Sequence, residues 1–153
     1  MQEQLDYSIS VQKELKAAIA NESLALFYQP KLDRELNVVG AEGLLRWPRE
    51  DGKNIPTAEF IELAEESNLI LPLGEWIFHQ ACKQLQDWSS RPEYAHLSLS
   101  VNISAKQIWQ NDFVEIIRRI LSNFSFQPNK LIIEITEGVM LKSLSETLDK
   151  LAA

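Results

Sequence analysis

The spacing of hydrophobic residues changes along the chain and divides it into helical and extended segments. Residues 10–20 carry apolar side chains three and four positions apart, which predicts an amphipathic helix. Residues 24–32 and 38–47 have the apolar character of two strands, with Pro30 near the end of the first. The polar turn 33–37 between them is too short for a parallel crossover, so the two strands are expected to form an antiparallel hairpin.

After this hairpin the predicted elements alternate between helix and strand. Helices are expected from an N-cap at Thr57, over 73–89, from an N-cap at Ser104 to about 124, and over 143–153; strands are expected over 97–104 and 130–136. Such alternation implies right-handed crossovers and a parallel sheet covered by helices. The chain is therefore expected to form an α/β fold, either an open four-stranded sheet or the first half of a barrel.

The faces of the predicted strands can be read directly, because side chains alternate between the two faces of a strand. In strand 97–104 the odd-numbered residues are apolar and suit contact with helices, whereas the even-numbered residues are small and polar. Three strands each carry one strong oxygen donor: Glu42, Asn102 and Glu134. A carboxylate within a buried strand is costly unless it is paired, hydrogen-bonded or bound to a metal. Two carboxylates and an amide suit Mg²⁺, Mn²⁺ or Ca²⁺ better than zinc.

Other interpretations of these residues stay open at this point. Arg46 lies on the face of Glu42 and provides a cation for a phosphate oxygen or for a carboxylate. The pattern alone favours a structural salt bridge between Glu42 and Arg46, with Asn102 fixing a loop, because carboxylates in strands are often structural. His79 and Cys82 have a spacing that fits zinc, but a packed helix is favoured because no other His or Cys lies nearby in sequence.

Composition and charge restrict the class of protein and its partners. The 153 residues suffice for one domain, and a hydrophobic share of 45% with 24% charged residues excludes wholesale disorder. Fifteen Lys and Arg against 22 Asp and Glu give a formal charge of −7, which argues against binding to duplex nucleic acid. No apolar run is long enough to span a membrane, and no signal-peptide pattern is present. The single cysteine fits a reducing compartment, so a cytoplasmic location is expected.

Five segments in order resemble the EAL family, which comprises bacterial phosphodiesterases that hydrolyse the second messenger cyclic di-GMP. They are YQPKLD (28–33), GAEGLLRW (40–47), AEESNLI (64–70), SVNIS (100–104) and IEITE (133–137). The resemblance implies the first part of a modified TIM (β/α)₈ barrel with an antiparallel second strand. It implies a linker-type N-terminal helix over 1–22 and an EAL domain over 23–153 that is truncated before the second half of the barrel.

The resemblance also implies roles for residues of this chain. Three residues match the family's ligands of a divalent metal, Mg²⁺ or Mn²⁺: Glu42, Asn102 and Glu134. Of these, Glu42 and Glu134 are also expected to be catalytic. Gln29 and Arg46 match residues that contact the dinucleotide, and Glu137 matches a glutamate that stabilises a catalytic loop. The implied reaction is hydrolysis of cyclic di-GMP to linear pGpG by metal-activated water.

Two departures from the family pattern qualify this expectation. Gly43 replaces the alanine of the EAL signature; it is expected to face away from the metal and to cost at most about 1 kcal/mol of strand stability. The chain also stops before the family's Asp-Asp-Phe-Gly-Thr-Gly segment, and it therefore lacks the paired aspartates, a lysine and a late glutamate. The expectation is that the chain alone does not turn over cyclic di-GMP at a useful rate.

Two alternative functions follow if catalysis is absent, namely a cyclic di-GMP-binding module and a protein-interaction module. Half a barrel would leave a sheet edge unpaired, so a homodimer or a domain-swapped dimer is expected. The N-terminal helix makes an upstream sensor or cyclase module plausible in a longer parent protein.

Overall fold

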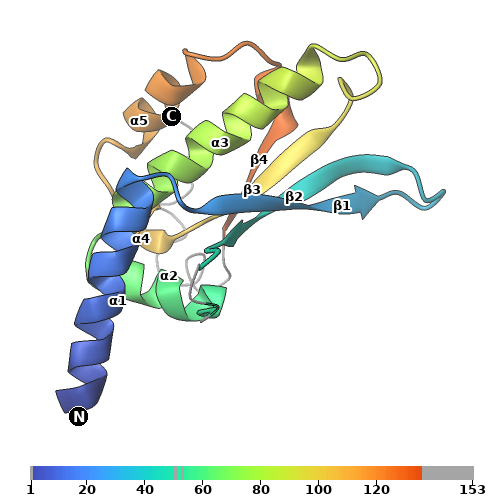
Figure 1. Cartoon of the computed structure of the whole chain (residues 1–153). Helices are drawn as coiled ribbons and strands as arrows, with labels where there is room; N and C mark the ends of the chain where they lie inside the picture. The colour runs from blue at the N-terminus through green and yellow to red at the C-terminus, as the bar shows by residue number, and fades with distance from the viewer. Residues whose placement is uncertain (1, 50–51, 53, 136–153) are drawn as a thin grey trace.

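The computed structural model describes residues 2–49, 52 and 54–135 of the chain. The elements, in order, are α1 (Gln2–Ala20), β1 (Ala25–Leu32), β2 (Val38–Arg46), α2 (Thr57–Glu66), α3 (Ile70–Ser89), β3 (Ser98–Ile103), α4 (Ala105–Ile108), α5 (Phe113–Leu121), a 3₁₀ turn (Pro128–Lys130) and β4 (Leu131–Ile135) (Figure 1). The predicted alternation of helix and strand after the hairpin is confirmed over this range. The predicted helix 143–153 and the candidate residue Glu137 lie outside the described residues.

The four strands form one sheet in the order β1-β2-β3-β4. Strands β1 and β2 pair antiparallel, as the short turn predicted, whereas β2, β3 and β4 pair in parallel. The antiparallel pairing of the first two strands is thus confirmed, but the strand that runs against the other three is the first, β1, and not the second as the family resemblance implied. The carboxyl ends of β2, β3 and β4 therefore lie at one edge of the sheet.

The sheet is strongly curved, with its polar face on the concave side. The side chain of Lys31 on β1 reaches Glu134 on β4, at a distance of 3.0 Å between Nζ and Oε1. In a flat sheet these two residues would be separated by three strand spacings of about 4.8 Å and also by a four-residue offset along the strands, because Lys31 is level with Ser98 and Glu134 with Asn102. Together these separations exceed the combined reach of the two side chains. Curvature of this kind is what the first part of a barrel requires, and it brings residues of all four strands together on one face.

The opposite, convex face carries the helices and a hydrophobic core. The odd-numbered residues of β3 are at most 3% exposed and pack among side chains from α3 and α5, which confirms the predicted faces of this strand. A second cluster joins α1, α2 and the first half of α3 around Leu15 and Phe60, both fully buried. Trp47, directly after β2, packs edge-on against Phe60 with ring centroids 5.6 Å apart. The core thus holds the sheet from its convex side and leaves the concave side available.

Two predicted helix boundaries differ from the structure. Ser104 is the N-cap of α4 as predicted, with Gln107 completing a capping box, but the single helix expected up to about 124 is two helices separated at 109–112. The Asn-Asp pair at 111–112 explains the break, because these side chains favour caps and turns over helix interiors. The prediction of Thr57 as an N-cap is wrong: Pro56 takes that position, and the Thr57 hydroxyl donates to the Leu45 carbonyl at 3.1 Å.

Helices α1 and α3 both begin before the residues predicted. Helix α1 starts at Gln2 rather than at 10, and its buried side chains all lie in the second half of the helix. Helix α3 starts at Ile70 rather than at 73, which places Pro72 in the first turn, where its missing N–H costs no intrahelical hydrogen bond. None of the helices in the described ranges is both long enough and apolar enough to cross a membrane.

Cys82 is completely buried in α3, in agreement with the packed-helix interpretation of this segment. Burial raises the pKa of the Cys82 thiol to about 11. At pH 8 we expect iodoacetamide to alkylate Cys82 at least about 100-fold more slowly in the native chain than in urea, because each pKa unit lowers the thiolate fraction about tenfold. Mass spectrometry of timed samples measures both rates. Equal rates with and without urea would show that this part of α3 is open to solvent.

Candidate functional site

The three oxygen donors identified in the sequence lie on the concave face, on adjacent strands. Glu42 occupies the middle of β2, whereas Asn102 and Glu134 are each one residue from the end of their strands. The Asn102 side-chain amide donates to Glu42 Oε1 at 3.2 Å. Asn102 and Glu134 are register partners in the parallel pair of β3 and β4, so their side chains lie on the same face. The structure therefore brings these three residues together.

Lys31 is a fourth member of this group, and the sequence analysis did not identify it. Its ammonium lies 3.0 Å from Glu134 Oε1 and 2.7 Å from the hydroxyl of Ser100, a residue that is only 1% exposed. Lys31 shares a face with Gln29, two residues before it on β1, and this alternation is the sequence signal that would have placed it beside the site.

Small residues allow β2 and β3 to approach each other closely next to Lys31. Gly40 on β2 is the register partner of both Lys31 and Ser98. A Cβ atom at Gly40 would lie 2.5 Å from Ser98 Oγ and 2.6 Å from its carbonyl oxygen, so a larger residue does not fit without displacing the strand. This close approach of β2 to β3 helps Lys31 to reach across the sheet.

Gln29 and Arg46, the candidate substrate-binding residues, are both exposed on the same concave surface. Gln29 is the register partner of Glu42. Arg46 stands at the carboxyl end of β2 and donates to the Leu45 carbonyl at 2.9 Å and to the Thr57 hydroxyl at 3.4 Å. The ion pairs within the described ranges do not include one between Glu42 and Arg46, so the structural salt bridge that the pattern favoured is wrong.

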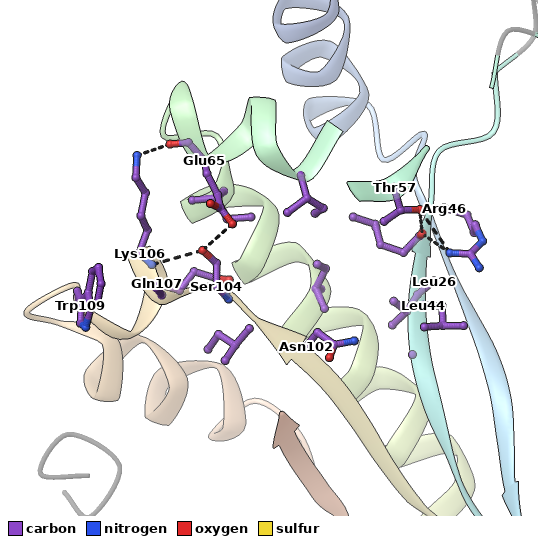
Figure 2. A pocket seen from close by; sticks show the side chains of 17 residues that line it. Leu26, Leu44, Arg46, Thr57, Glu65, Asn102, Ser104, Lys106, Gln107 and Trp109 are labelled. Atoms are coloured by element: carbon purple, nitrogen blue, oxygen red, sulfur yellow. Dashed lines mark hydrogen bonds between the residues drawn. The ribbon is translucent and has the colours of Figure 1, made fainter. Parts of the chain in front are cut away.

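A cavity of about 540 Å³ opens at the carboxyl edge of β2 and β3, next to Asn102. Figure 2 shows Arg46 and Thr57 on one side of this cavity and Ser104 and Lys106 on the other, with Asn102 between them. Its apolar lining includes Leu26, Leu44, Ile61 and Trp109. A concave, largely apolar cavity with a few polar groups is the usual form of a small-molecule site. Two cationic side chains at its rim suit an anionic ligand.

The far side of this cavity is held by a hydrogen-bonded connection between α2 and α4. The Ser104 hydroxyl donates to Glu65 Oε1 at 3.2 Å. The Lys106 ammonium contacts the Glu65 carbonyl oxygen and donates to the Asn68 side chain at 3.2 Å. These contacts fix the position of the loop that directly follows β3, and so of the strand end that carries Asn102. Sequence reasoning missed this connection, because it joins side chains some forty positions apart in the chain.

The donor set on the concave face fits a divalent cation that prefers oxygen ligands. In the part of the chain that the structure describes, no three His, Cys, Asp or Glu side chains gather as a metal cluster, because the third donor here is an amide. When the Asn102 amide nitrogen donates to Glu42, its oxygen remains available as an acceptor. The Lys31 ammonium at Glu134 shows that this position attracts positive charge. Two carboxylates and an amide oxygen are ligands suited to Mg²⁺ or Mn²⁺.

Gly43, the departure from the EAL signature, is buried on the convex side of β2, away from Glu42, as the alternation of faces predicted. A Cβ atom at this position would meet the side chain of Leu26 at 3.2–3.4 Å. The terminal atoms of a leucine can move by a few tenths of an ångström, so the structure tolerates either glycine or alanine here.

Comparison with known proteins identifies the family to which this chain belongs. The family model of the EAL domain matches residues 12–153. The chain is 36% identical over 134 residues to the signaling protein YkoW of Bacillus subtilis, covering 87% of this chain and 16% of YkoW. It is 34% identical over 136 residues to the bifunctional diguanylate cyclase/cyclic di-GMP phosphodiesterase MucR of Pseudomonas aeruginosa, covering 88% of this chain and 20% of MucR. The chain thus spans about a fifth or less of the length of these relatives.

Among solved structures, the PaMucR phosphodiesterase in complex with c-di-GMP superposes with a TM-score of 0.87 at 32% identity, covering 94% of this chain and 58% of that one. The EAL enzyme Bd1971 bound to cAMP and cyclic-di-GMP superposes with a TM-score of 0.85 at 28% identity, covering 99% of this chain and 42% of that one. The fold and the polar concave face define an α/β domain of the barrel type, with its candidate site at the carboxyl ends of the strands. The chain belongs to the EAL domain family.

Proposed function

We propose that this chain binds cyclic di-GMP together with Mg²⁺ or Mn²⁺ and forms part of an EAL phosphodiesterase site that opens the ring to linear pGpG. The observation that carries the proposal is the placement of Glu42, Asn102 and Glu134 on adjacent strands beside a cavity with a cationic rim. The names of the relatives support the substrate, since MucR is a cyclic di-GMP phosphodiesterase and its solved domain holds c-di-GMP.

Each candidate residue within the described ranges has a role that its position supports. The carboxylates of Glu42 and Glu134 and the amide oxygen of Asn102 would hold the metal, and the hydrogen bond from Asn102 orients Glu42. When bound, the metal would supply a water of lowered pKa and stabilise negative charge on the phosphate. Arg46 is positioned to bind a phosphate oxygen through its guanidinium, and Gln29 to contact the dinucleotide beside Glu42. The loop-stabilising role of Glu137, outside the described residues, rests on the family motif.

We propose further that these 153 residues bind the dinucleotide but do not hydrolyse it on their own. The family resemblance implies paired aspartates in the metal site, and these 153 residues contain no pair of adjacent aspartates. Residues 1–22 would serve as a linker helix to an upstream sensor or cyclase module, and residues 23–153 as the EAL portion. The relatives support this organisation, because MucR combines two activities and this chain corresponds to only 20% of it.

The test combines binding and turnover on the purified chain. Calorimetry with cyclic di-GMP should show saturable binding that is tighter with Mg²⁺ than with EDTA, and that weakens in Arg46→Ala, which loses the phosphate contact. Chromatography of overnight reactions with Mn²⁺ should show no pGpG. Product formed at rates typical of enzymes would overturn the binding-only proposal. Absence of binding under both conditions would contradict the substrate assignment and favour an interaction module, whose oligomeric state light scattering would then report.

A further inference from the structure

We infer that Lys31 is a resident counter-ion of the site, whose ammonium neutralises Glu134 until a divalent cation binds and displaces it. The inference rests on the proposed function in one respect, namely that a metal binds at Glu134. Beyond the proposed function, Lys31 would compete with the metal for Glu134 and so lower the affinity of the site for the metal.

The contacts of Lys31 place its charge within the donor set. The ammonium touches Glu134 Oε1 at 3.0 Å and the Ser100 hydroxyl at 2.7 Å, and these two acceptors use two of its three protons. Glu134 is the register neighbour of Asn102, which in turn donates to Glu42. The ammonium therefore lies on the same concave face as the three oxygen donors and is bound directly to one of them.

This ion pair differs in construction from an ordinary surface salt bridge. It joins β1 to β4 across two intervening strands, and the register partner of Lys31 on β2 is Gly40, which has no side chain. Ser100, which accepts the second hydrogen bond, is 1% exposed. The side chains of Lys31 and Glu134 are themselves 39% and 38% exposed, so the ammonium can withdraw into solvent without unfolding the sheet.

A divalent cation at Glu134 Oε1 and the Lys31 ammonium compete for the same oxygen atom. An oxygen ligand of Mg²⁺ lies about 2.1 Å from the ion, closer than an ammonium approaches a carboxylate, so both cations cannot share Glu134 Oε1 without strong repulsion. The cost of breaking the Lys31 contact is then subtracted from the metal affinity. Because partly exposed ion pairs contribute at most about 1 kcal/mol, we expect removal of the ammonium to tighten Mn²⁺ binding about three- to fivefold.

The test uses the full chain and Mn²⁺ alone as the probe. Lys31→Met keeps the length of the side chain and removes its charge, and Lys13→Met, at an exposed position on α1, is the matched control. Electron paramagnetic resonance of free Mn²⁺ gives the dissociation constants. The Lys31 variant should bind Mn²⁺ about three- to fivefold more tightly than the wild type. The Lys13 variant should bind it within about twofold of the wild-type affinity. Unchanged or weaker binding in the Lys31 variant overturns the inference.

A second measurement uses the wild-type chain, so it still tests the inference if the Lys31 variant folds poorly. The NMR signal of the Lys31 Cε methylene should shift on titration with Mg²⁺, and that of Lys13 should not. A Lys31 signal that stays fixed while Mg²⁺ binds contradicts displacement but leaves the proposed function standing. If neither metal binds to the wild type or to the variant, both the inference and the metal part of the proposed function fail.

Discussion

Replacing Gly74 by Ala is expected to destabilise the chain by about 1–3 kcal/mol, although alanine is the better helix former. A Cβ atom at Gly74 would overlap the side-chain amide nitrogen of Gln107 and lie 2.5 Å from its Cδ. Gln107 is 5% exposed, and its Oε1 accepts from the Ser104 backbone amide at 3.0 Å in the capping box of α4. Displacing it would cost this buried hydrogen bond as well as the packing of α4 on α3.

Urea unfolding followed by circular dichroism measures the effect, with Gly43→Ala as the matched control. The same added methyl at Gly43 meets only the movable end of Leu26, so its effect should stay within about 1 kcal/mol. The double variant Gly74→Ala/Gln107→Ala should lose less stability than the two single losses added together, because the clash is absent once Gln107 is shortened. A Gly74→Ala chain as stable as the wild type would show that Gln107 does not pack on Gly74.

Replacing Glu42 by Gln should weaken Mn²⁺ binding by at least about tenfold, the loss that follows even when an outer partner of a metal ligand is removed. Glutamine keeps the size of the side chain and one oxygen, so it can still accept from Asn102. The change therefore removes one negative charge from the donor set with little effect on the concave face. Cyclic di-GMP binding should lose its dependence on Mg²⁺ for the same reason.

Calorimetry of Mn²⁺ binding provides the measurement, and Glu35→Gln provides the control. Glu35 is exposed in the turn between β1 and β2, and its replacement by Gln lowers the net negative charge of the chain by the same amount as Glu42→Gln. A Glu35→Gln chain with wild-type affinity and a Glu42→Gln chain with reduced affinity would separate a local ligand from a general electrostatic effect. Equal losses in both variants would mean that Mn²⁺ responds only to the overall charge of the chain.

The concave face was predictable from sequence because it depends on a local rule. Side chains alternate along a strand, so the polar residues Ser98, Ser100 and Asn102 had to lie opposite the apolar positions of β3. The hairpin was predictable for a similar reason, since a turn of five residues cannot connect parallel strands. The family motifs then indicated which of the polar residues are candidates for a site.

The features that sequence did not reveal depend on the curvature of the sheet and on contacts between distant segments. Lys31 meets Glu134 only because the sheet bends enough to bring β1 near β4, and no local pattern encodes that distance. Arg46 could be placed beside Glu42 on one face, but its choice of Leu45 and Thr57 as partners depends on where α2 begins. The cavity next to Asn102 likewise results from the packing of α2 and α4, which the sequence pattern did not position.

The central claim is that Glu42, Asn102 and Glu134 hold one divalent cation together. Paramagnetic broadening by Mn²⁺ tests it most directly, because an unpaired-electron centre broadens the NMR signals of nearby nuclei and leaves distant ones sharp. Substoichiometric Mn²⁺ should remove the backbone amide signals of all three residues, while Mg²⁺ at the same concentration should not. Sharp signals at these three positions, or broadening centred on another part of the chain, would contradict the account.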